Sequence, residues 1–561
     1  MKDGLIFDAA EALETFAADR VLAVDLETTG FSPYQDRIAV LSVANSSGDV
    51  AVVQTPKGVV PAAMRELLAP REAITHNGTN FDLLFLAQAG VRIGKHYDTL
   101  IGEQVLNTAA SWTRKNSLAA TMQRRLGKVY KLDIDHKTWQ ADVLTEQQLA
   151  YAAADVAWLH HIRAIQESEA DRRGLSDALQ KEQALTQIVV QMQLNGIPLH
   201  FSTLVELKEK AEQDSFEARA LLLDRLGEEF NVNSPRQVKA ALNAAYELNL
   251  KNTRAQTLAP MREVYPLIDA ILITRQANKR TGIYNDDWLN KYVFGERIHG
   301  RYRQLGAGTK RFTSSDPNMQ QIPREWRTMF GREKGKKVIK ADWSQIELRV
   351  VAHLFQDDVL RNVLTGDDDL HTLMACTMFG VDDNGITSEI RRRGKAGTFT
   401  FFFGGGMKGV IAAAAKWGTV ITQRDAQTML SRLAKRFRVT KQKITEARKR
   451  DKYENIVTIN LPWGHQRTLR REERTAATLV NTPVQGTAAI GLKEALFEAE
   501  ARGLLPYLSA IVHDEIVLCS VPDSEAEDVA TELAAAMEAG MRKVCYSLPT
   551  PAEVEIGDYW K

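Results

Sequence analysis

Acidic side chains stand at the ends of two predicted strands that lie far apart in the chain. Residues 340–349 read Lys-Ala-Asp-Trp-Ser-Gln-Ile-Glu-Leu-Arg, and the apolar pair before them predicts a strand that ends at Asp342 and leads into an amphipathic helix. Residues 510–518 predict two apolar strands joined at His513-Asp514-Glu515. Burying a carboxylate is costly unless it is paired or binds a metal. Ion-paired or surface acids are the alternative, but acids on two strands favour a two-metal site for phosphoryl transfer.

A second group of acids begins in the first third of the chain. Residues 21–30 predict a buried strand and a turn, and because side chains alternate along a strand, Asp25 and Glu27 point to the same side. Residues 76–84 predict a turn that leads into an apolar helix, with Asp82 in its first turns. Neighbouring carboxylates repel each other unless a cation lies between them. A solvent-facing strand with two acids is the alternative to a metal site.

A later helix adds a fourth acid to this group. Thr145 and Gln148 have the spacing of a capping box, which predicts that a helix begins after Thr145. That helix carries Tyr151 and Asp155, which share one face because they are four residues apart. Three separated segments therefore supply four acids and one tyrosine to a single predicted constellation.

A third segment combines basic and aromatic side chains at helical spacing. Leu370-His371-Thr372 opens one predicted helix, and the next, from about Thr387, carries Arg391, Lys395 and Phe399 on one side. Two cations followed by an aromatic ring suit a nucleoside triphosphate, because the cations meet the phosphates and the ring meets the base. A solvated charge run is the alternative for the basic residues alone.

The composition limits the class of protein. The chain has 561 residues, a hydrophobic share of 44% and a charged share of 25%, which predict several domains of a soluble globular protein. The net charge of +1 means that a nucleic-acid groove would need its charges segregated. Three cysteines without a Cys-x-x-Cys pair argue against a zinc site or a disulfide framework. Without a signal-peptide core or an apolar run of about 20 residues, we expect a cytoplasmic protein with no membrane partner.

Several of these segments resemble motifs of the family A DNA polymerases, the group of bacterial DNA polymerase I. Residues 342–349 resemble the first catalytic motif and residues 513–515 the third. Residues 391–404, which end in Phe403-Gly404, are similar to the second motif, on the mobile fingers. Two further motifs are matched by Thr-Lys-Arg-Phe-Thr-Ser-Ser-Asp-Pro-Asn-Met-Gln at residues 309–320 and by Asn-Thr-Pro-Val-Gln-Gly at residues 481–486, which we read as a helix start.

The resemblance implies a template-directed DNA polymerase that acts on primer–template DNA and dNTPs with two Mg²⁺ ions per site, for which Mn²⁺ can substitute. Asp342 and Asp514 would bind the metals, and Lys395 would neutralise phosphate charge and donate a proton to pyrophosphate. Glu347 would exclude a ribose 2′-OH. The implied nucleotide-binding residues are Arg391, Lys395, Phe399, His371, Glu347, Gln345 and Phe403. The implied DNA-binding residues are Arg311, Gln485, Asn481, His513 and Glu515.

The N-terminal acids resemble the 3′–5′ proofreading exonuclease domain of the same family. The resemblance implies that two divalent metals are held by Asp25, Glu27, Asp82 and Asp155. Tyr151 would orient the attacking water. One departure is Gly78, which stands where the bacterial enzyme has an asparagine, so that Asn77 or Asn80 would substitute. Because the resemblance begins almost at residue 1, the family's 5′ nuclease domain is expected to be missing, which suggests a phage enzyme in a host cytoplasm.

The implied fold is a multi-domain α/β protein. A ribonuclease H-like exonuclease domain would span residues 1–172 and a right-hand polymerase domain residues 173–561. Within the latter we expect the thumb at about 201–300, the palm at about 301–365 and 481–561, and the fingers at about 366–480. We expect a monomer. Two competing functions are a single-subunit RNA polymerase, against which Glu347 and the exonuclease domain argue, and a non-catalytic DNA-binding clamp, against which the intact acids argue.

Departures from the family pattern fall near the predicted nucleotide site. Trp343 replaces a commoner tyrosine, Thr400 stands where the bacterial enzyme has glycine, and Phe403 keeps the ring of a tyrosine but lacks its hydroxyl. Gly394 and Gly397 lie inside the predicted fingers helix, where each costs about 1 kcal/mol relative to alanine. They predict a helix that is loosely held when no nucleotide is bound.

Overall fold

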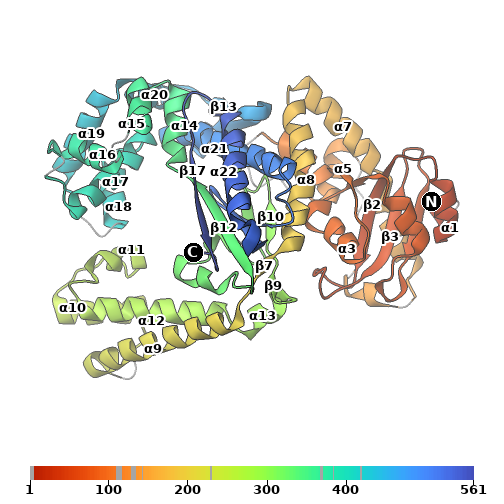
Figure 1. Ribbon diagram of the computed structural model, residues 1–561, viewed down its shortest axis with the longest axis horizontal. Coiled ribbons are helices and arrows are strands. Elements are labelled where there is room, and N and C mark those ends of the chain that lie inside the picture. The colour runs from red at the N-terminus through yellow and green to blue at the C-terminus, as the bar shows by residue number, and fades with distance from the viewer. Residues whose placement is uncertain are drawn as a thin grey trace.

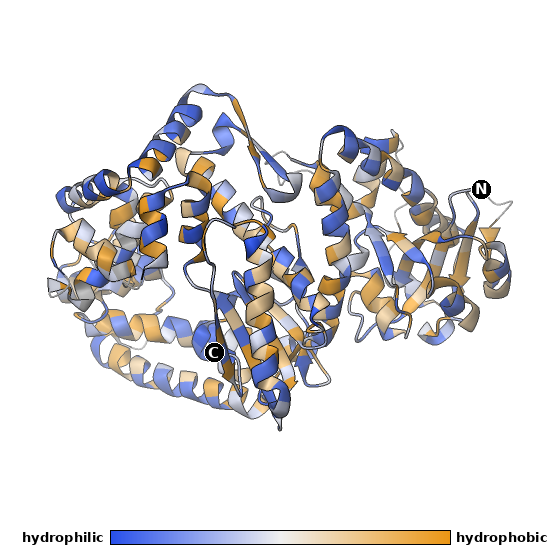
Figure 2. Ribbon diagram, turned by 45° about the horizontal axis from the view of Figure 1, so that its top comes forward, coloured by the Kyte–Doolittle hydropathy of each residue, from blue (hydrophilic) through white to orange (hydrophobic). Residues whose placement is uncertain are grey.

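The computed structural model describes residues 5–108, 116–127, 134, 136–141, 143–227, 230–366, 370–382, 385–416 and 420–561. An N-terminal domain lies at one end of the molecule, and a larger domain with two projecting lobes forms the rest (Figure 1). Hydrophilic residues occur along the long helices of both domains (Figure 2). Within the described ranges, none of the helices combines the length and apolar character needed to cross a membrane.

A six-stranded mixed sheet forms the centre of the N-terminal domain. Its strands are β1 (Leu5–Ile6), β2 (Val21–Thr28), β3 (Ile38–Ala44), β4 (Val50–Gln54), β5 (Glu72–Thr75) and β6 (Lys95–Asp98). Their order is β1-β4-β3-β2-β5-β6, and β2 pairs antiparallel with β3 and parallel with β5. The described helices are α1 (Ala9–Thr15), α2 (Ala62–Leu68), α3 (Asp82–Gln88), α4 (Thr99–Leu106), α5 (Leu118–Leu126), α6 (Glu146–Ala157) and α7 (Leu159–Arg172). Because side chains alternate along β2, Leu22 and Val24 pack in a core with α1–α3, whereas Ala23 packs in one with α6 and α7.

Helix α8 (Ser176–Asn195) belongs to the cores of both domains. Val190 packs with the N-terminal domain, and Leu185 and Val189 pack with the larger domain. The helix ends at Gly196, whose φ of +60° favours glycine. A small sheet follows, made of β7 (Ile197–Pro198), β8 (Val293–Phe294) and β9 (Arg297–Ile298).

The lower lobe, in the region predicted as the thumb, is helical. It contains α9 (Phe201–Leu226), α10 (Pro235–Tyr246), α11 (Ala255–Leu258), the 3-10 helix η4 (Ala259–Met261), α12 (Pro266–Ile283) and α13 (Asp286–Tyr292). Helices α9 and α12 pack side by side (Figure 1) and share a small core that includes Leu222 and Ile271. Helix α10 begins after Ser234, whose side chain caps the helix by accepting a hydrogen bond from the backbone N–H of Gln237.

The upper lobe, in the region predicted as the fingers, is also mainly helical. Its helices are α15 (Asp358–Thr365), α16 (Leu370–Phe379), α17 (Ser388–Phe402), α18 (Met407–Lys416), α19 (Gln423–Arg436) and α20 (Arg438–Tyr453), followed by the hairpin β13 (Ile456–Asn460) and β14 (Gln466–Arg470). The tips of the two lobes touch, because α11 and η4 contact α18. The predicted starts of two helices, at Leu370 and after Thr387, are confirmed.

A four-stranded antiparallel sheet joins the two lobes. Its strands are β12 (Lys336–Trp343), β15 (Leu508–Val512), β16 (Glu515–Pro522) and β17 (Ala552–Gly557), in the order β15-β16-β12-β17. The helices beside it are α14 (Ile346–Phe355), α21 (Ala476–Ala501) and α22 (Ala526–Arg542). A short ribbon, β10 (Arg301–Arg303) with β11 (Thr313–Ser315), precedes it. The predicted strand at Asp342 and the predicted strand pair at residues 510–518 are both confirmed.

The predicted helix start at residues 481–486 is wrong. Helix α21 begins at Ala476, because Thr475 caps it through the backbone N–H of Thr478. Pro483 therefore lies inside the helix, where its missing N–H leaves one turn without its regular hydrogen bond. The start was placed at residues 481–486 on the family motif, which carries no signal for the cap at Thr475.

Candidate active sites

Three of the four predicted N-terminal acids come together on the sheet. Strand β2 presents Asp25 and Glu27 on one side, and α6 brings Asp155 opposite them. One carboxylate oxygen from each lies within 4.8 Å of the others. The set offers only oxygen ligands, which suit a hard divalent cation such as Mg²⁺.

Asp82 borders this cluster as the first residue of α3. Its Oδ1 accepts a hydrogen bond of 3.0 Å from the backbone N–H of Leu26, which fixes the carboxylate of Asp82 beside β2. Burial and the neighbouring negative charges raise the pKa of Glu27 to about 8, and burial raises the pKa of Asp82 to about 7 and that of Asp155 to about 6. Burial also raises the pKa of Asp25 well above its ordinary value. Such a concentration of negative charge needs protons or cations.

The predicted position of Tyr151 beside the acids is confirmed. Thr145 and Gln148 form the capping box that starts α6. One turn further along, the hydroxyl of Tyr151 donates a hydrogen bond to Asp155, and the ring packs against Trp139. The tyrosine is therefore held at the edge of the acidic cluster.

The segment before Asp82 shows why Gly78 is present. A Cβ at this position would lie 2.1 Å from Oγ1 of Thr75, so only glycine fits. The buried carboxylate of Asp98 holds the segment by accepting hydrogen bonds from the backbone N–H groups of Asn77 and Thr79. Of the two predicted substitutes, Asn77 adopts a left-handed conformation, and Asn80 has a buried Oδ1 without a partner among the described atoms.

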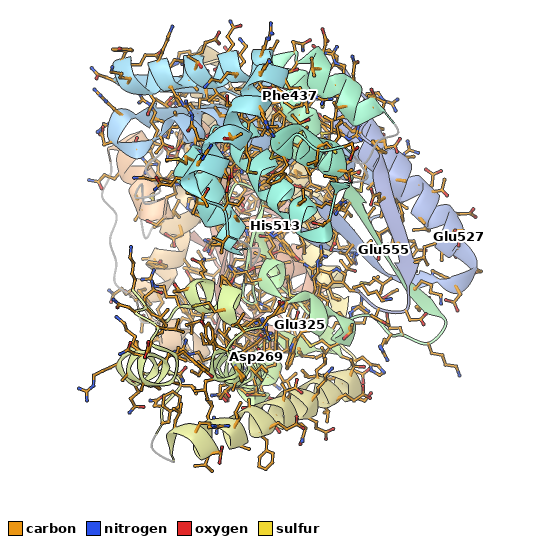
Figure 3. The ribbon with its side chains drawn as sticks, turned by 90° about the vertical axis from the view of Figure 1, so that its left-hand side faces the viewer. Asp269, Glu325, Phe437, His513, Glu527 and Glu555 are labelled. Carbon is orange, nitrogen blue, oxygen red and sulfur yellow. The ribbon has the colours of Figure 1, made fainter. Side chains whose placement is uncertain are left out.

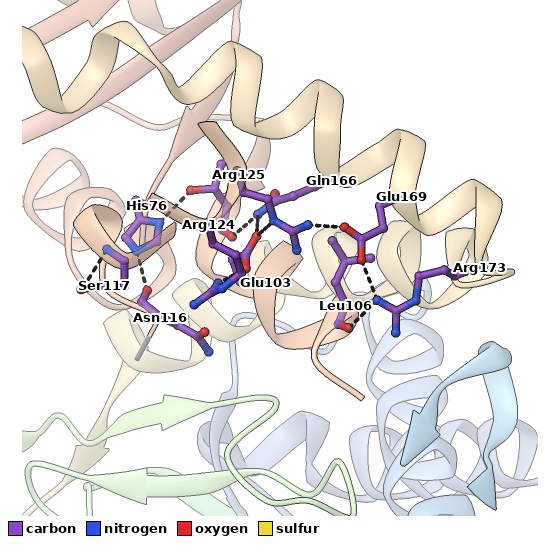
Figure 4. Close-up of polar contacts among 12 residues, drawn as sticks. His76, Glu103, Leu106, Asn116, Ser117, Arg124, Arg125, Gln166, Glu169 and Arg173 are labelled. Carbon is purple, nitrogen blue, oxygen red and sulfur yellow. Dashed lines mark hydrogen bonds and ion pairs between the residues drawn. The ribbon is translucent and has the colours of Figure 1, made fainter. Parts of the chain in front are cut away.

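An ion-pair network fixes the helices behind the acids (Figure 4). Glu103 of α4 is buried and pairs with Arg124 and Arg125 of α5. Arg125 also pairs with Glu169 of α7, which Arg173 contacts at 2.7 Å. The network holds α4, α5 and α7 together. The spacing of residues within each helix did not predict these ion pairs between helices.

The acids of the larger domain meet at adjacent strand ends. Asp342 near the end of β12 lies opposite Glu515 at the start of β16, and Asp514 lies in the turn between β15 and β16. His513, with φ of +59°, forms the same turn, and Figure 3 shows it between the upper and lower lobes. Burial raises the pKa of Asp514 to about 6, with Arg311 opposing the shift, and desolvation and Glu515 raise that of Asp342.

Arg311 lies close to two acids that have different predicted functions. Its Nη2 lies 2.7 Å from Oε1 of Glu347 on α14 and 3.7 Å from Oδ1 of Asp514. The sequence placed these residues in a DNA contact, a sugar contact and a metal site respectively. Their proximity was not predicted, because spacing within one element says nothing about ion pairs between elements.

Glu515, which we predicted to contact DNA, is instead turned toward protein groups. Its buried carboxylate accepts a hydrogen bond of 2.8 Å from the indole of Trp560 and lies 3.4 Å from Arg327. The ring of Trp560 in turn lies under the Arg327 guanidinium at 4.3 Å. Glu515 therefore holds the C-terminal segment, through Trp560, against the sheet beside Asp342.

The predicted nucleotide-binding residues of the fingers lie along α17. Arg391 is exposed, and Lys395 and Phe399 are half-buried one and two turns later. Phe403 ends the helix with its ring 5.9 Å from that of Phe399. The side chain of His371 lies outside the described residues.

The glycines of α17 pack closely against its neighbours. A Cβ at Gly394 would lie 2.9 Å from the Cβ of Ala375 on α16, and one at Gly397 would lie 2.6 Å from Sδ of Met378. These glycines let α17 approach α16 closely, so close packing, and not a loosely held helix, explains why they are present. The sequence of α17 alone could not show this, because the contact involves α16.

The remaining predicted residues lie near the start of α14, on α21 and at the end of β12. Gln345 has φ of +55° in the turn before α14. Asn481 and Gln485 are half-buried on α21, and Oδ1 of Asn481 is buried without a partner among the described atoms. Trp343 is buried at the end of β12.

Comparisons with known proteins point to one family for both halves of the chain. The family model of DNA polymerase family A matches residues 202–561, and that of a 3′–5′ exonuclease matches residues 6–170. DNA polymerase I of Aquifex aeolicus is 28% identical over 98% of this chain and 97% of its own length. DNA polymerases I of Chloroflexus aurantiacus and Pseudomonas aeruginosa are also 28% identical, but the chain spans only 61% and 63% of their lengths. The fold matches the solved POL domain of Pol1 from M. smegmatis in complex with DNA primer-template and dNTP, with a TM-score of 0.81, 22% identity and 99% coverage of both chains.

Proposed function

Because the chain belongs to DNA polymerase family A and joins a 3′–5′ exonuclease domain to a DNA-directed DNA polymerase domain, we propose that its two groups of acids divide the chemistry between synthesis and proofreading. The palm acids would serve primer extension with dNTPs, and the N-terminal acids would serve hydrolysis of an unpaired primer 3′ end. We assign residues 1–172 to the exonuclease and residues 173–561 to the polymerase. The observation that carries the proposal is the convergence of acids at two separate strand ends.

In the polymerase site, Asp342 and Asp514 would hold the divalent metals. Bound Mg²⁺ ions there would lower the pKa of the primer 3′-OH and neutralise the leaving pyrophosphate. Carboxylate oxygens are suitable ligands, and the raised pKa values of both acids are those of groups that gain from a nearby cation.

The fingers would bind the incoming nucleotide through α17. Arg391 and Lys395 would contact the phosphates, and Lys395 would donate a proton to pyrophosphate. Phe399 would lie against the sugar and base, with His371 assisting at the phosphates. The one-turn spacing of these side chains along a described helix supports this assignment.

The primer end would be held from the minor groove. Every correct base pair offers acceptors there, so Arg311 and Gln485 can test the shape of a pair without reading its sequence. Glu347 would exclude the 2′-OH of a ribonucleotide. Arg311 is paired with Glu347, so binding of the primer would exchange one partner of Arg311 for another.

In the exonuclease site, Asp25, Glu27, Asp82 and Asp155 would hold the divalent metals that activate water. Tyr151 would orient that water through its hydroxyl, which now contacts Asp155. The named relatives are bacterial, and a phage origin stays a prediction.

Primer extension on a 3′-labelled mismatch and on a matched primer tests the division of labour. Asp342→Asn should abolish extension in Mg²⁺ and leave degradation of single strands intact, whereas Asp25→Asn with Glu27→Gln should do the opposite. Supplying rNTPs in place of dNTPs tests the RNA polymerase alternative. If Asp342→Asn abolished both activities in a folded protein, the assignment of two independent sites would be wrong.

A further inference from the structure

A buried charged cluster around Glu182 of α8 lies outside both groups of acids. Its carboxylate is fully buried and forms an ion pair with Lys493 of α21, which is equally buried. It also accepts hydrogen bonds from Nε2 of His465 at 2.9 Å and from Nε2 of Gln304 at 2.7 Å. A buried ion pair contributes little net stability, because desolvation offsets the attraction. The importance of the cluster therefore lies in the segments that it positions.

The negative charge of Glu182 compensates the positive charges of nearby buried side chains. Burial alone would raise its pKa, but Lys493 and His465 hold the pKa at about 2. Lys310 is almost fully buried nearby, and desolvation lowers its pKa to about 8 while the charge of Glu182 opposes that shift. Lys493 and Arg467 also disfavour the charged form of Lys310. Without the carboxylate, these cations would repel one another in a low-dielectric interior.

The cluster lies directly under the turn that carries Arg311. In that turn Lys310 donates its backbone N–H to the carbonyl of Ala307 at 2.8 Å, and Ala307 donates to the carbonyl of Arg311 at 3.2 Å. Lys310 has φ of +64°, a strained conformation for a residue with a side chain. On the other side of Arg311, the ring of Phe312 lies 5.7 Å from the ammonium of Lys493. Both residues adjacent to Arg311 thus face the cluster.

A second contact fixes the turn to α21. A Cβ at Gly308 would lie 3.0 Å from the guanidinium carbon of Arg467. Arg467 in turn donates a hydrogen bond of 2.9 Å to Oγ1 of Thr482, one turn before Gln485. The two predicted minor-groove residues, Arg311 and Gln485, are therefore set by the same group of buried contacts.

The neighbouring face of α8 contacts the N-terminal domain. Gln183, next to Glu182, accepts a hydrogen bond of 2.7 Å from the backbone N–H of Asp98 and donates one of 3.0 Å to its carbonyl. Asp98 holds the segment before Asp82. Single-strand degradation therefore reports whether α8 is intact.

From these contacts we propose that Glu182 is a positioning residue for Arg311, acting through Lys493, Lys310 and Phe312 on the turn that carries it. The proposal rests on the proposed minor-groove function of Arg311. Loss of the Glu182 charge should let the turn shift and should weaken recognition of the primer end while leaving the metal ligands in place.

A primer that ends in a 3-deazapurine tests the proposal, because it lacks the minor-groove acceptor N3. Wild type should extend this primer roughly tenfold more slowly than the natural one, a factor equal to ~1.4 kcal/mol. Arg311→Ala should show no such difference. Glu182→Gln and Lys310→Met should lose most of the difference, and Glu182→Gln with Arg311→Ala should be no slower than Arg311→Ala alone.

The matched control is Glu494→Gln. Glu494 follows Lys493 in α21 and pairs with Lys181 and Lys543. It makes no described contact with the turn that carries Arg311. This variant should keep the wild-type sensitivity to the 3-deazapurine. Lys310→Met removes a buried charge and should fold even if Glu182→Gln does not, and thermal unfolding with single-strand degradation checks each variant.

The outcomes separate the two levels of the proposal. If Arg311→Ala kept wild-type sensitivity, the minor-groove function of Arg311 would be wrong. If Arg311→Ala lost the sensitivity but folded Glu182→Gln and Lys310→Met kept it, only the positioning function of Glu182 would be overturned. Additive losses in the double variant would also overturn it.

Discussion

At the residue scale, the ion pair between Arg311 and Glu347 links recognition of the primer to recognition of the sugar. Glu347→Ala should admit ribonucleotides and should also slow dNTP addition, because Arg311 loses the partner that holds its side chain in place before the primer binds. Glu347→Gln keeps the bulk and removes only the charge, so it should slow dNTP addition by roughly tenfold or less, the equivalent of ~1.4 kcal/mol, and still reject ribonucleotides. Single-turnover rates with dNTP and rNTP measure both effects. An unchanged rNTP-to-dNTP ratio in Glu347→Ala would rule out the steric function.

Phe399 offers a second residue-scale test. In Phe399→Tyr the new hydroxyl would lie where the sugar 3′-OH is expected and would replace the interaction that a dideoxynucleotide lacks. A hydrogen bond contributes about 0.5–1.5 kcal/mol, so dideoxynucleotide use should rise at least severalfold with little change for dNTPs. Phe403→Tyr, one turn away with its ring 5.9 Å from Phe399, is the control and should show no rise. Competition between ddNTP and dNTP in extension gives the ratio, and no rise for Phe399→Tyr would mean that its ring does not face the sugar.

The exonuclease acids make metal binding depend on protons. The pKa of Glu27 is about 8 and that of Asp82 about 7 in the metal-free fold. Both are raised, so the folded chain holds protons that the unfolded chain has lost, and these groups contribute less stability as pH rises from about 4 to 8. Mg²⁺ must displace those protons. Calorimetric titration in two buffers should show more protons released near pH 6 than near pH 9, and the difference should shrink in Glu27→Gln, in which only Asp82 of these two acids still holds a proton.

At the element scale, the two glycines of α17 should respond differently to alanine. Gly394 faces the Cβ and Cα of Ala375, which move only with the α16 backbone, whereas Gly397 faces the flexible ends of Met378 and Met429. Overpacking costs about 1–3 kcal/mol, against a gain of about 1 kcal/mol in helix propensity. Gly394→Ala should therefore lower the unfolding midpoint and raise the KM for dNTPs, and Gly397→Ala should be close to neutral. Equal effects of the two changes would argue against close packing of α16 and α17.

Local chemistry explains which elements could be predicted from the sequence. The capping box at Thr145, the helix start at Thr387 and the strand that reaches Asp342 each depend on a few adjacent residues, and all three are present in the structure. The start of α21 was misplaced because it was taken from the motif at residues 481–486, whereas the residue that caps the helix is Thr475. Contacts such as that of Lys493 with Glu182, which are 311 residues apart, have no local signal at all.

At the scale of the whole molecule, the two predicted sites lie in different domains that share one helix. Val190 and Leu185 of α8 belong to separate cores, so neither domain can rotate against the other without disturbing packing around α8. A primer end that passes from one site to the other must therefore move itself, because the two domains keep their relative positions.

The contact of α11 and η4 with α18 closes the larger domain into a ring formed by the four-stranded sheet and its two lobes. A closed ring makes DNA loading a topological problem. A linear duplex can thread through such a ring from its end, but a covalently closed primed circle can enter only when the tips of the lobes part. Association should thus be slower on a primed circle than on the same circle cut once, while dissociation from the circle is retarded by the same gate. Equal association rates on cut and uncut circles would show that the ring stands open in solution.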